Sequence, residues 1–223
     1  GLSVYEGSDR EHYPSIAYGK GIPDAVTQMT TAVPFNDAGV LERRLTALQS
    51  EGRLPACLIM EAAMMNCGVI LPEPGYLADV RRITKKFGVV WIVDEVKTGL
   101  NVAAGGATEL FGIKPDLVCL AKALGAGIPT GAIGGSDEMW AMVDSGDVYM
   151  VGTFNGNPLA MAAARANLER VMTPDAYKHL GRLNDQLLDG AQGIIDRYKL
   201  AAYAVGIESK GVITFAQSKV VDY

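Results

Sequence analysis

Two ionisable side chains come shortly after short apolar runs, and their spacing suggests a shared site. Asp94 follows the run Val-Val-Trp-Ile-Val at 89–93, and Lys122 follows the run Leu-Val-Cys-Leu at 117–120. Such runs predict buried strands. The two residues are 28 positions apart, which suits one crossover connection in a parallel sheet. Both are therefore expected to face one crevice beyond the carboxyl ends of the strands.

The chemistry of this pair is that of an imine-forming site. A lysine in apolar surroundings has a lowered pKa, because its ammonium form is poorly solvated, and it becomes a nucleophilic amine. A carboxylate held against a pyridinium keeps the ring nitrogen protonated, so that the ring accepts electrons. Taken singly, Asp94 could cap the next turn with Glu95 solvated, and Lys122 could be a surface lysine at a strand end. The combination favours the chemical interpretation.

The elements that position these residues alternate in type. Apolar spacing and turn residues predict helices at 37–48, 75–87, 158–172 and 175–198, and strands at 56–60, 89–93, 117–120, 130–133, 202–207 and 211–215. Residues 1–34 are expected to be mainly loop. Apolar strands alternating with amphipathic helices predict an α/β fold, a three-layer, mostly parallel sheet with helices on both faces. The alternation gives way to long helices near Thr173 and Pro174.

Composition excludes several other functions. The 223 residues carry a net charge of -5 and 49% hydrophobic residues, as in a soluble globular protein without the basic clusters of a nucleic-acid binder. Three irregularly spaced cysteines and two histidines support neither a disulfide framework nor a metal site, so a reducing, cytoplasmic setting is expected. The apolar runs are too short for a membrane span, and no membrane role is expected.

Four motifs in a fixed order resemble those of a known enzyme family. They are Glu-Pro-Gly-Tyr-Leu at 73–77 with Ile-Val-Asp-Glu-Val-Lys-Thr-Gly at 92–99, Gly-Ile-Lys-Pro-Asp-Leu at 112–117, Lys122, and Gly-Thr-Phe-Asn-Gly-Asn-Pro-Leu-Ala at 152–160. In order and spacing they resemble the class III aminotransferases, fold-type I enzymes that depend on pyridoxal 5'-phosphate. The resemblance is closest to the glutamate-1-semialdehyde aminomutase branch, and it runs from about residue 21 to residue 171 and more weakly beyond.

The resemblance implies a role for each motif residue. Lys122 would form the internal aldimine, a Schiff base, with the cofactor, and Asp94 would bind the pyridine nitrogen. Val96 would pack against one face of the ring. Thr153, with the backbone amide of Gly152, would reach the cofactor phosphate of the neighbouring subunit in a homodimer.

Other residues keep two interpretations open. Thr153 could instead stand at a helix N-terminus. Glu61 and Asn66 match a strand end and the loop after it in the family, and Glu61 is either a supporting hydrogen-bond partner or a turn carboxylate. By the same resemblance, residues 1–172 would be part of the cofactor-binding large domain, and residues 173–223 the start of a C-terminal small domain.

The chain also departs from the family pattern. The loop Ala62–Met65 replaces a proline that usually follows the glutamate, so its shape is expected to differ. Leu100 and Asn101 stand where many relatives carry an aromatic residue and an arginine. The phosphate-binding turn and the ring-stacking aromatic residue that precede this region in the family are not present, and relatives continue past the last residue, so the chain is expected to be truncated at both ends.

The expected function is amino-group transfer, by an aminotransferase or aminomutase, from a small amino acid or amine to a carbonyl acceptor. The same residues could serve racemisation or decarboxylation, because the bond that breaks depends on how the substrate is oriented. A truncated, non-catalytic fragment is the third possibility.

Overall fold

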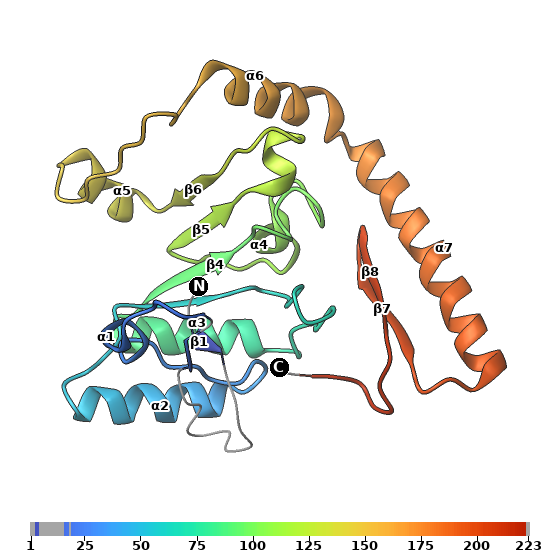
Figure 1. The fold of residues 1–223 in the computed structure, drawn as a ribbon, viewed down its shortest axis with the longest axis horizontal. Helices are drawn as coiled ribbons and strands as arrows, with labels where there is room; N and C mark the ends of the chain where they lie inside the picture. Colours follow the sequence, from blue (N-terminus) through green and yellow to red (C-terminus); the bar gives the residue numbers. More distant parts are fainter. Residues whose placement is uncertain (1–2, 5–15, 18, 222–223) are drawn as a thin grey trace. The chain divides into compact units, whose positions relative to one another are not determined.

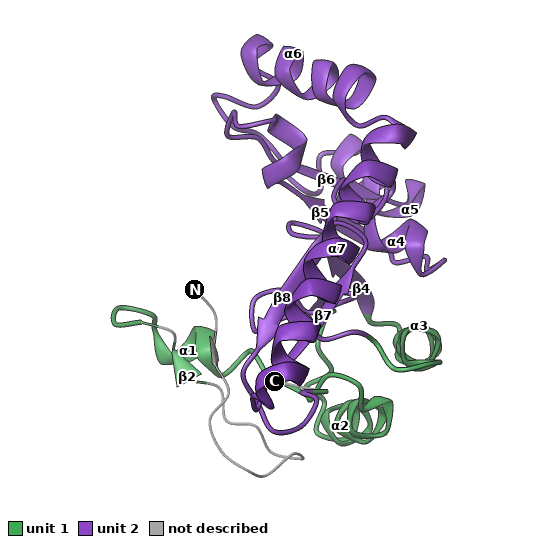
Figure 2. Ribbon diagram, turned by 90° about the vertical axis from the view of Figure 1, so that its right-hand side faces the viewer, with its two compact units in different colours: residues 1–58, 72–89, 221–223 green, residues 59–71, 90–220 purple. Residues whose placement is uncertain are grey.

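The computed structural model describes residues 3–4, 16–17 and 19–221 (Figure 1). The chain divides into two compact units (Figure 2). Unit 1 comprises Gly1–Leu58, Pro72–Val89 and Val221–Tyr223, and unit 2 comprises Ile59–Leu71 and Val90–Val220. The predicted boundary at 172/173 separates a cofactor-binding large domain from a small domain, and these two compact units do not test it. It stays a prediction.

Unit 1 contains two amphipathic helices that the sequence predicts. Its elements are β1 (Ser3–Val4) paired antiparallel with β2 (Ile16–Ala17), α1 (Asp24–Thr27), α2 (Ala38–Ser50) and α3 (Tyr76–Phe87). Asp37 caps α2, because its Oδ1 accepts a hydrogen bond from the Val40 amide at 2.9 Å. Gly88 ends α3 with φ at 67°, a left-handed conformation that glycine adopts without steric cost. Both predicted helices are confirmed.

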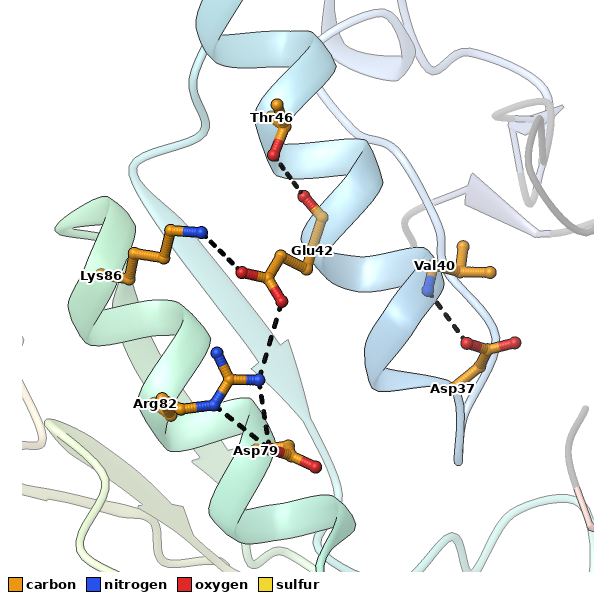
Figure 3. Close-up of polar contacts among 7 residues, drawn as sticks. All are labelled: Asp37, Val40, Glu42, Thr46, Asp79, Arg82 and Lys86. Atoms are coloured by element: carbon orange, nitrogen blue, oxygen red, sulfur yellow. Dashed lines mark hydrogen bonds and ion pairs between the residues drawn. The ribbon is translucent and has the colours of Figure 1, made fainter.

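The two helices of unit 1 face each other with their apolar sides buried and a charged group at the rim. Glu42 of α2 accepts a hydrogen bond from Lys86 of α3 at 2.6 Å, and Arg82 lies 3.6 Å from Glu42 and 3.1 Å from Asp79 (Figure 3). These charges are half-exposed, so the ion pairs orient the helices more than they stabilise them. The buried residues carry the packing: Val40, Leu41, Leu45 and Leu48 of α2 and Leu77, Val80 and Ile83 of α3.

The central sheet has the order β3 (Cys57–Met60), β4 (Val90–Asp94), β5 (Leu117–Leu120) and β6 (Ala132–Gly135). β4 and β5 are parallel, whereas β6 runs antiparallel to β5. Trp91 and Val93 of β4 are fully buried. β3 is an edge strand of this sheet, and alternate residues are exposed. The apolar run at 56–60 predicts a buried strand, and this prediction is wrong: Cys57 and Ile59 are exposed, so one face of β3 is not covered by the described residues.

The second half of unit 2 contains the long helices and the hairpin that the sequence predicts. α6 (Pro158–Ala166) continues into a π-helical turn, η2 (Asn167–Val171), and is followed by α7 (Pro174–Tyr198) and the antiparallel strands β7 (Tyr203–Ile207) and β8 (Lys210–Thr214). The hairpin packs on α7, since a Cβ atom on Gly211 would collide with the Asn184 side chain. These predictions are confirmed.

Four short helices were not predicted: α1, α4 (Gly106–Leu110), the 3-10 helix η1 (Lys122–Gly125) and α5 (Asp137–Asp144). They have too few residues for a clear apolar period, although Ser136 is a recognisable cap for α5, accepting from the Met139 amide at 3.4 Å. None of the helices in the described part of the chain has the length and apolar character needed to cross a membrane.

Candidate active site

The register of β4 and β5 places the two predicted reactive residues at one end of the sheet. Asp94 is the last residue of β4 and lies opposite Cys119 of β5. Lys122 comes three residues after Cys119 and starts η1. Because the two strands are neighbours and parallel, both side chains leave the sheet at the carboxyl ends of the strands. The sequence-based prediction of a common edge is confirmed by this register.

Asp94 is oriented by its own turn. Its Oδ1 accepts a hydrogen bond from the backbone amide of Val96 at 2.9 Å, and its side chain is half-buried. The capping interpretation of Asp94 is therefore correct, but it leaves Oδ2 for another partner.

Lys122 has unusual backbone geometry. Its φ is 44°, in the left-handed region that non-glycine residues enter at a cost of about 1–3 kcal/mol. The residue is exposed, so the expectation of apolar surroundings is wrong. The reason is that Lys122 starts a turn at the rim of an open cleft instead of ending inside the strand.

The interpretation in which Glu95 is solvated is wrong, because the Glu95 side chain is buried. It is 2% exposed. Its Oε1 accepts from the amide and hydroxyl of Thr108, each at 2.6 Å, and its Oε2 accepts from the Ala107 amide at 3.0 Å and from the Thr98 hydroxyl. The carboxylate thus fixes residues 95–108 as one folded loop after Asp94.

Gly106 makes room for this carboxylate. Its φ is 69°, and a Cβ atom there would lie 2.5 Å from Oε2 of Glu95. Any larger residue would therefore push the acceptor away from the amides of Ala107 and Thr108.

The loop after β3 lies beside the site. Glu61 Oε2 accepts from the Met65 amide at 3.0 Å, and Met64 and Ile70 exchange two backbone hydrogen bonds of 3.0 Å. Ala62 and Ala63 of the loop are fully buried. The turn-carboxylate interpretation of Glu61 is thus confirmed.

A cleft of about 560 Å³ opens within unit 2 next to Lys122. Its lining comes from the loop after β3, the turn after β4, the start of η1 and the start of β8: Met65, Asn66, Gly68, Val69, Lys97, Asn101, Lys122, Ala123, Lys210, Gly211 and Val212. Lys97 donates a hydrogen bond from Nζ to the Met65 carbonyl at 3.1 Å. Hence three lysines from three different elements share one concave surface.

The charged groups around the cleft act on one another. Burial raises the pKa of Glu61, with the negative charge of Asp94 adding to the effect and Lys97 and Lys122 opposing it. Burial also raises the pKa of Cys119, again helped by Asp94. In Lys210, burial lowers the pKa and the positive charges of Lys97 and Lys122 lower it further.

Thr153 and Gly152 lie elsewhere in unit 2, in the exposed segment between α5 and α6. The Gly152 carbonyl accepts from the Asn155 amide at 3.0 Å. The N-cap of α6 is Asn157, whose Oδ1 accepts from the Ala160 amide at 2.9 Å. Thr153 is therefore not a helix N-terminal residue, and it does not line the cleft beside Lys122.

Sequence reasoning did not single out Lys97 and Lys210, which line the cleft. Lys97 was visible as the residue after Val96 in a recognised motif, whereas Lys210 had no signal, because only the hairpin fold brings it to the cleft. Asn66, which the resemblance matches to the loop after the strand end, lines the cleft. Val96 is half-buried next to Asp94.

Comparison with known proteins identifies the relatives of this chain. Residues 11–215 match the family described as Aminotransferase class-III. The chain is 39% identical over 203 residues to the glutamate-1-semialdehyde 2,1-aminomutase of Anaeromyxobacter sp. (strain Fw109-5), covering 91% of this chain and 46% of that protein. It is 43% identical over 168 residues to the protein of that name from Methylacidiphilum infernorum, covering 75% and 38%.

Solved structures show the same fold. An omega-transaminase from Sphaerobacter thermophilus superposes with a TM-score of 0.88 at 30% identity, covering 99% of this chain and 50% of that one. A glutamate-1-semialdehyde-aminomutase from Pseudomonas aeruginosa PAO1 in complex with PMP gives a TM-score of 0.82 at 26% identity, covering 98% and 49%. The predicted α/β fold class is confirmed, and the chain spans about half the length of these relatives. The chain belongs to the class-III aminotransferase family.

Proposed function

We propose that the protein transfers an amino group from a small amine or amino acid to a carbonyl acceptor, with pyridoxal 5'-phosphate as cofactor. The observation that carries this proposal is the β4–β5 register: Asp94 ends β4 and Lys122 follows β5 at the same end of the sheet, where Lys122 lines a cleft. The family match supports it, and so do the names of the relatives, which are aminomutases and transaminases. Those names favour amino-group transfer over racemisation or decarboxylation.

The residues present fit this cofactor. Its reactive groups are an aldehyde and a basic ring nitrogen, and the site offers an amine in Lys122 and a carboxylate in Asp94. When bound, the cofactor supplies an aldehyde for the substrate amine and a ring that withdraws electrons from the neighbouring carbon.

Each residue then has a defined task. Nζ of Lys122 would hold the cofactor, and as a free amine it would remove the proton from the substrate carbon that bears nitrogen and later return one. Asp94 would bind the protonated ring nitrogen, and its Oδ1 already accepts a hydrogen bond from the Val96 amide. Val96 would provide an apolar side for the ring.

We also propose a symmetric homodimer in which Thr153 and the Gly152 amide contact the cofactor phosphate of the partner. The segment around Thr153 exposes large apolar side chains, which mark a protein contact surface. Tyr149 is 85% exposed, Val151 64% and Phe154 80%. The three unpaired cysteines fit a reducing cytoplasm, where we place the protein.

The test of the reaction site uses the protein at its natural full length. It is incubated with pyridoxal 5'-phosphate, reduced with borohydride and digested, and the modified peptide is identified by mass spectrometry. We expect labelling of Lys122 and its loss in Lys122→Ala. Lys114→Ala removes an exposed lysine outside the cleft and should leave the label in place. Labelling of another lysine in the wild type would reject the assignment.

A further inference from the structure

The cleft beside Lys122 holds more positive charge than the proposed attachment to a cofactor requires. The chain is acidic, with 25 acidic and 20 basic residues, yet three of the eleven residues that line the cleft are lysines. Three ammonium groups on one concave surface repel one another unless an anion joins them. The surplus cations are Lys97 and Lys210.

Two hydrogen bonds from side chains to backbone carbonyls position the segments that carry Lys97 and Lys210. The Ser209 hydroxyl donates to the Asn101 carbonyl at 2.8 Å, which ties the β7–β8 turn to the loop that carries Lys97. The side-chain amide of Asn184 donates a hydrogen bond to the Lys210 carbonyl at 3.2 Å, which fixes the start of β8 on α7. The convergence of the two lysines is thus built into the fold and does not depend on two flexible side chains meeting by chance.

The three lysines of the cleft differ in how far acidic groups of the protein offset their positive charge. Glu61 interacts with Lys97 and Lys122, and its carboxylate also accepts from the Met65 amide. The charges that act on Lys210 are those of the other two lysines, and burial adds to their effect. Among the described residues Lys210 forms no ion pair, so its ammonium group is the one that most needs an external anion.

We propose that Lys210 and Lys97 form an anion subsite in this cleft that binds a carboxylate of the substrate while Lys122 reacts at its amino-bearing carbon. This inference rests on the proposed function and narrows it: the amino donor or the acceptor carries a carboxylate, and a simple amine is a poor substrate. Lys210 and Lys97 are specificity residues, whereas Lys122 is the catalytic one. The other anion that could occupy such a site is the cofactor phosphate, and the experiment separates the two.

The binding test uses the full-length protein and butanoate, a carboxylate without an amino group that binds but does not react. Titration calorimetry compares the wild type with Lys210→Met, which keeps the length of the side chain and removes its charge. We expect the dissociation constant of butanoate to rise about tenfold, as for the loss of one charge-assisted hydrogen bond. Lys210→Arg should restore most of the affinity. Lys178→Met, an exposed lysine of α7 outside the cleft, is the matched control and should behave as the wild type.

A second readout is the ratio of kcat/KM for 4-aminobutanoate to that for n-butylamine, which differ only at the carboxylate. We expect Lys210→Met and Lys97→Met to lower this ratio about tenfold and Lys178→Met to leave it unchanged. Unaltered butanoate affinity in Lys210→Met would overturn the subsite. A raised dissociation constant for pyridoxal 5'-phosphate with an unaltered ratio would also overturn it and assign the lysines to the cofactor phosphate.

The subsite and the proposed reaction fail independently. Weaker butanoate binding in Lys210→Met, together with no borohydride-stable label on Lys122, would uphold the anion subsite and reject amino-group transfer. A label on Lys122 with unchanged butanoate binding would do the reverse.

Discussion

Replacing Glu95 by glutamine tests whether one buried carboxylate holds the loop after Asp94. In the wild type this carboxylate accepts hydrogen bonds from the amides of Ala107 and Thr108 and from two hydroxyls. A glutamine has the same size but only one acceptor oxygen. Hydroxyl groups can turn to accept from its NH₂ group, whereas a backbone amide cannot. Whichever way the glutamine is oriented, one buried amide loses its acceptor.

The loss of stability in Glu95→Gln follows from this one backbone amide without an acceptor. A buried donor left without a partner destabilises the folded state by about 1–3 kcal/mol. With a urea m-value of roughly 3 kcal/mol/M, the unfolding midpoint falls by roughly 0.3–1 M. Trp91 is fully buried in β4, four residues before Glu95, so its fluorescence reports unfolding of this region. Amide hydrogen exchange of the peptide covering 105–109 should accelerate as well.

Glu109→Gln is the matched control. Glu109 is an exposed carboxylate in the same region, and its Oε2 accepts a single amide hydrogen bond, from Gly105 at 2.6 Å. A surface change of this kind shifts stability by less than about 0.5 kcal/mol. If Glu95→Gln shifts the midpoint no more than Glu109→Gln does and leaves exchange at 105–109 unchanged, the carboxylate does not hold the loop and the reasoning is refuted.

Three further outcomes are expected. Asp37→Ala removes the acceptor that caps α2 and should lower stability by about 1 kcal/mol in urea titration, whereas no change would deny the cap. Gly211→Ala places a Cβ atom against Asn184 and should destabilise the fold by about 1–3 kcal/mol. The control Gly190→Ala has open space around it in α7 and should stabilise slightly. The change in melting temperature should therefore be negative for Gly211→Ala and positive for Gly190→Ala, and the same sign for both would contradict the reasoning. Burial raises the pKa of Glu61 above its ordinary 4.5, so the folded state binds this proton more tightly, and the associated stability is complete below 4.5 and lost as pH rises through the raised pKa. Glu61→Gln should remove the part of the pH dependence that sets in above pH 4.5, and an unchanged profile of urea midpoints against pH would contradict it.

Local sequence determined the elements and the two residues proposed to react. The Asp37 cap, the apolar spacing of α2 and α3, and the left-handed Gly88 are signals within one or two helical turns, so they are readable without a partner. The apolar runs before Asp94 and Lys122 likewise mark strand ends, and their separation suits a crossover between neighbouring parallel strands. Such features depend on residues close in sequence, where period and turn chemistry dominate.

Tertiary structure alone decided the surroundings of those residues. Glu95 is buried because amides twelve and thirteen residues later fold back onto it, and no local pattern distinguishes that carboxylate from a solvated one. Lys210 reaches the cleft only because the β7–β8 hairpin packs on α7, which sets a residue 88 positions after Lys122 beside it. β6 runs antiparallel to β5 because the turn between them reverses the direction of the chain. Contacts between distant segments depend on the whole packing, and the sequence carries no local signal for them.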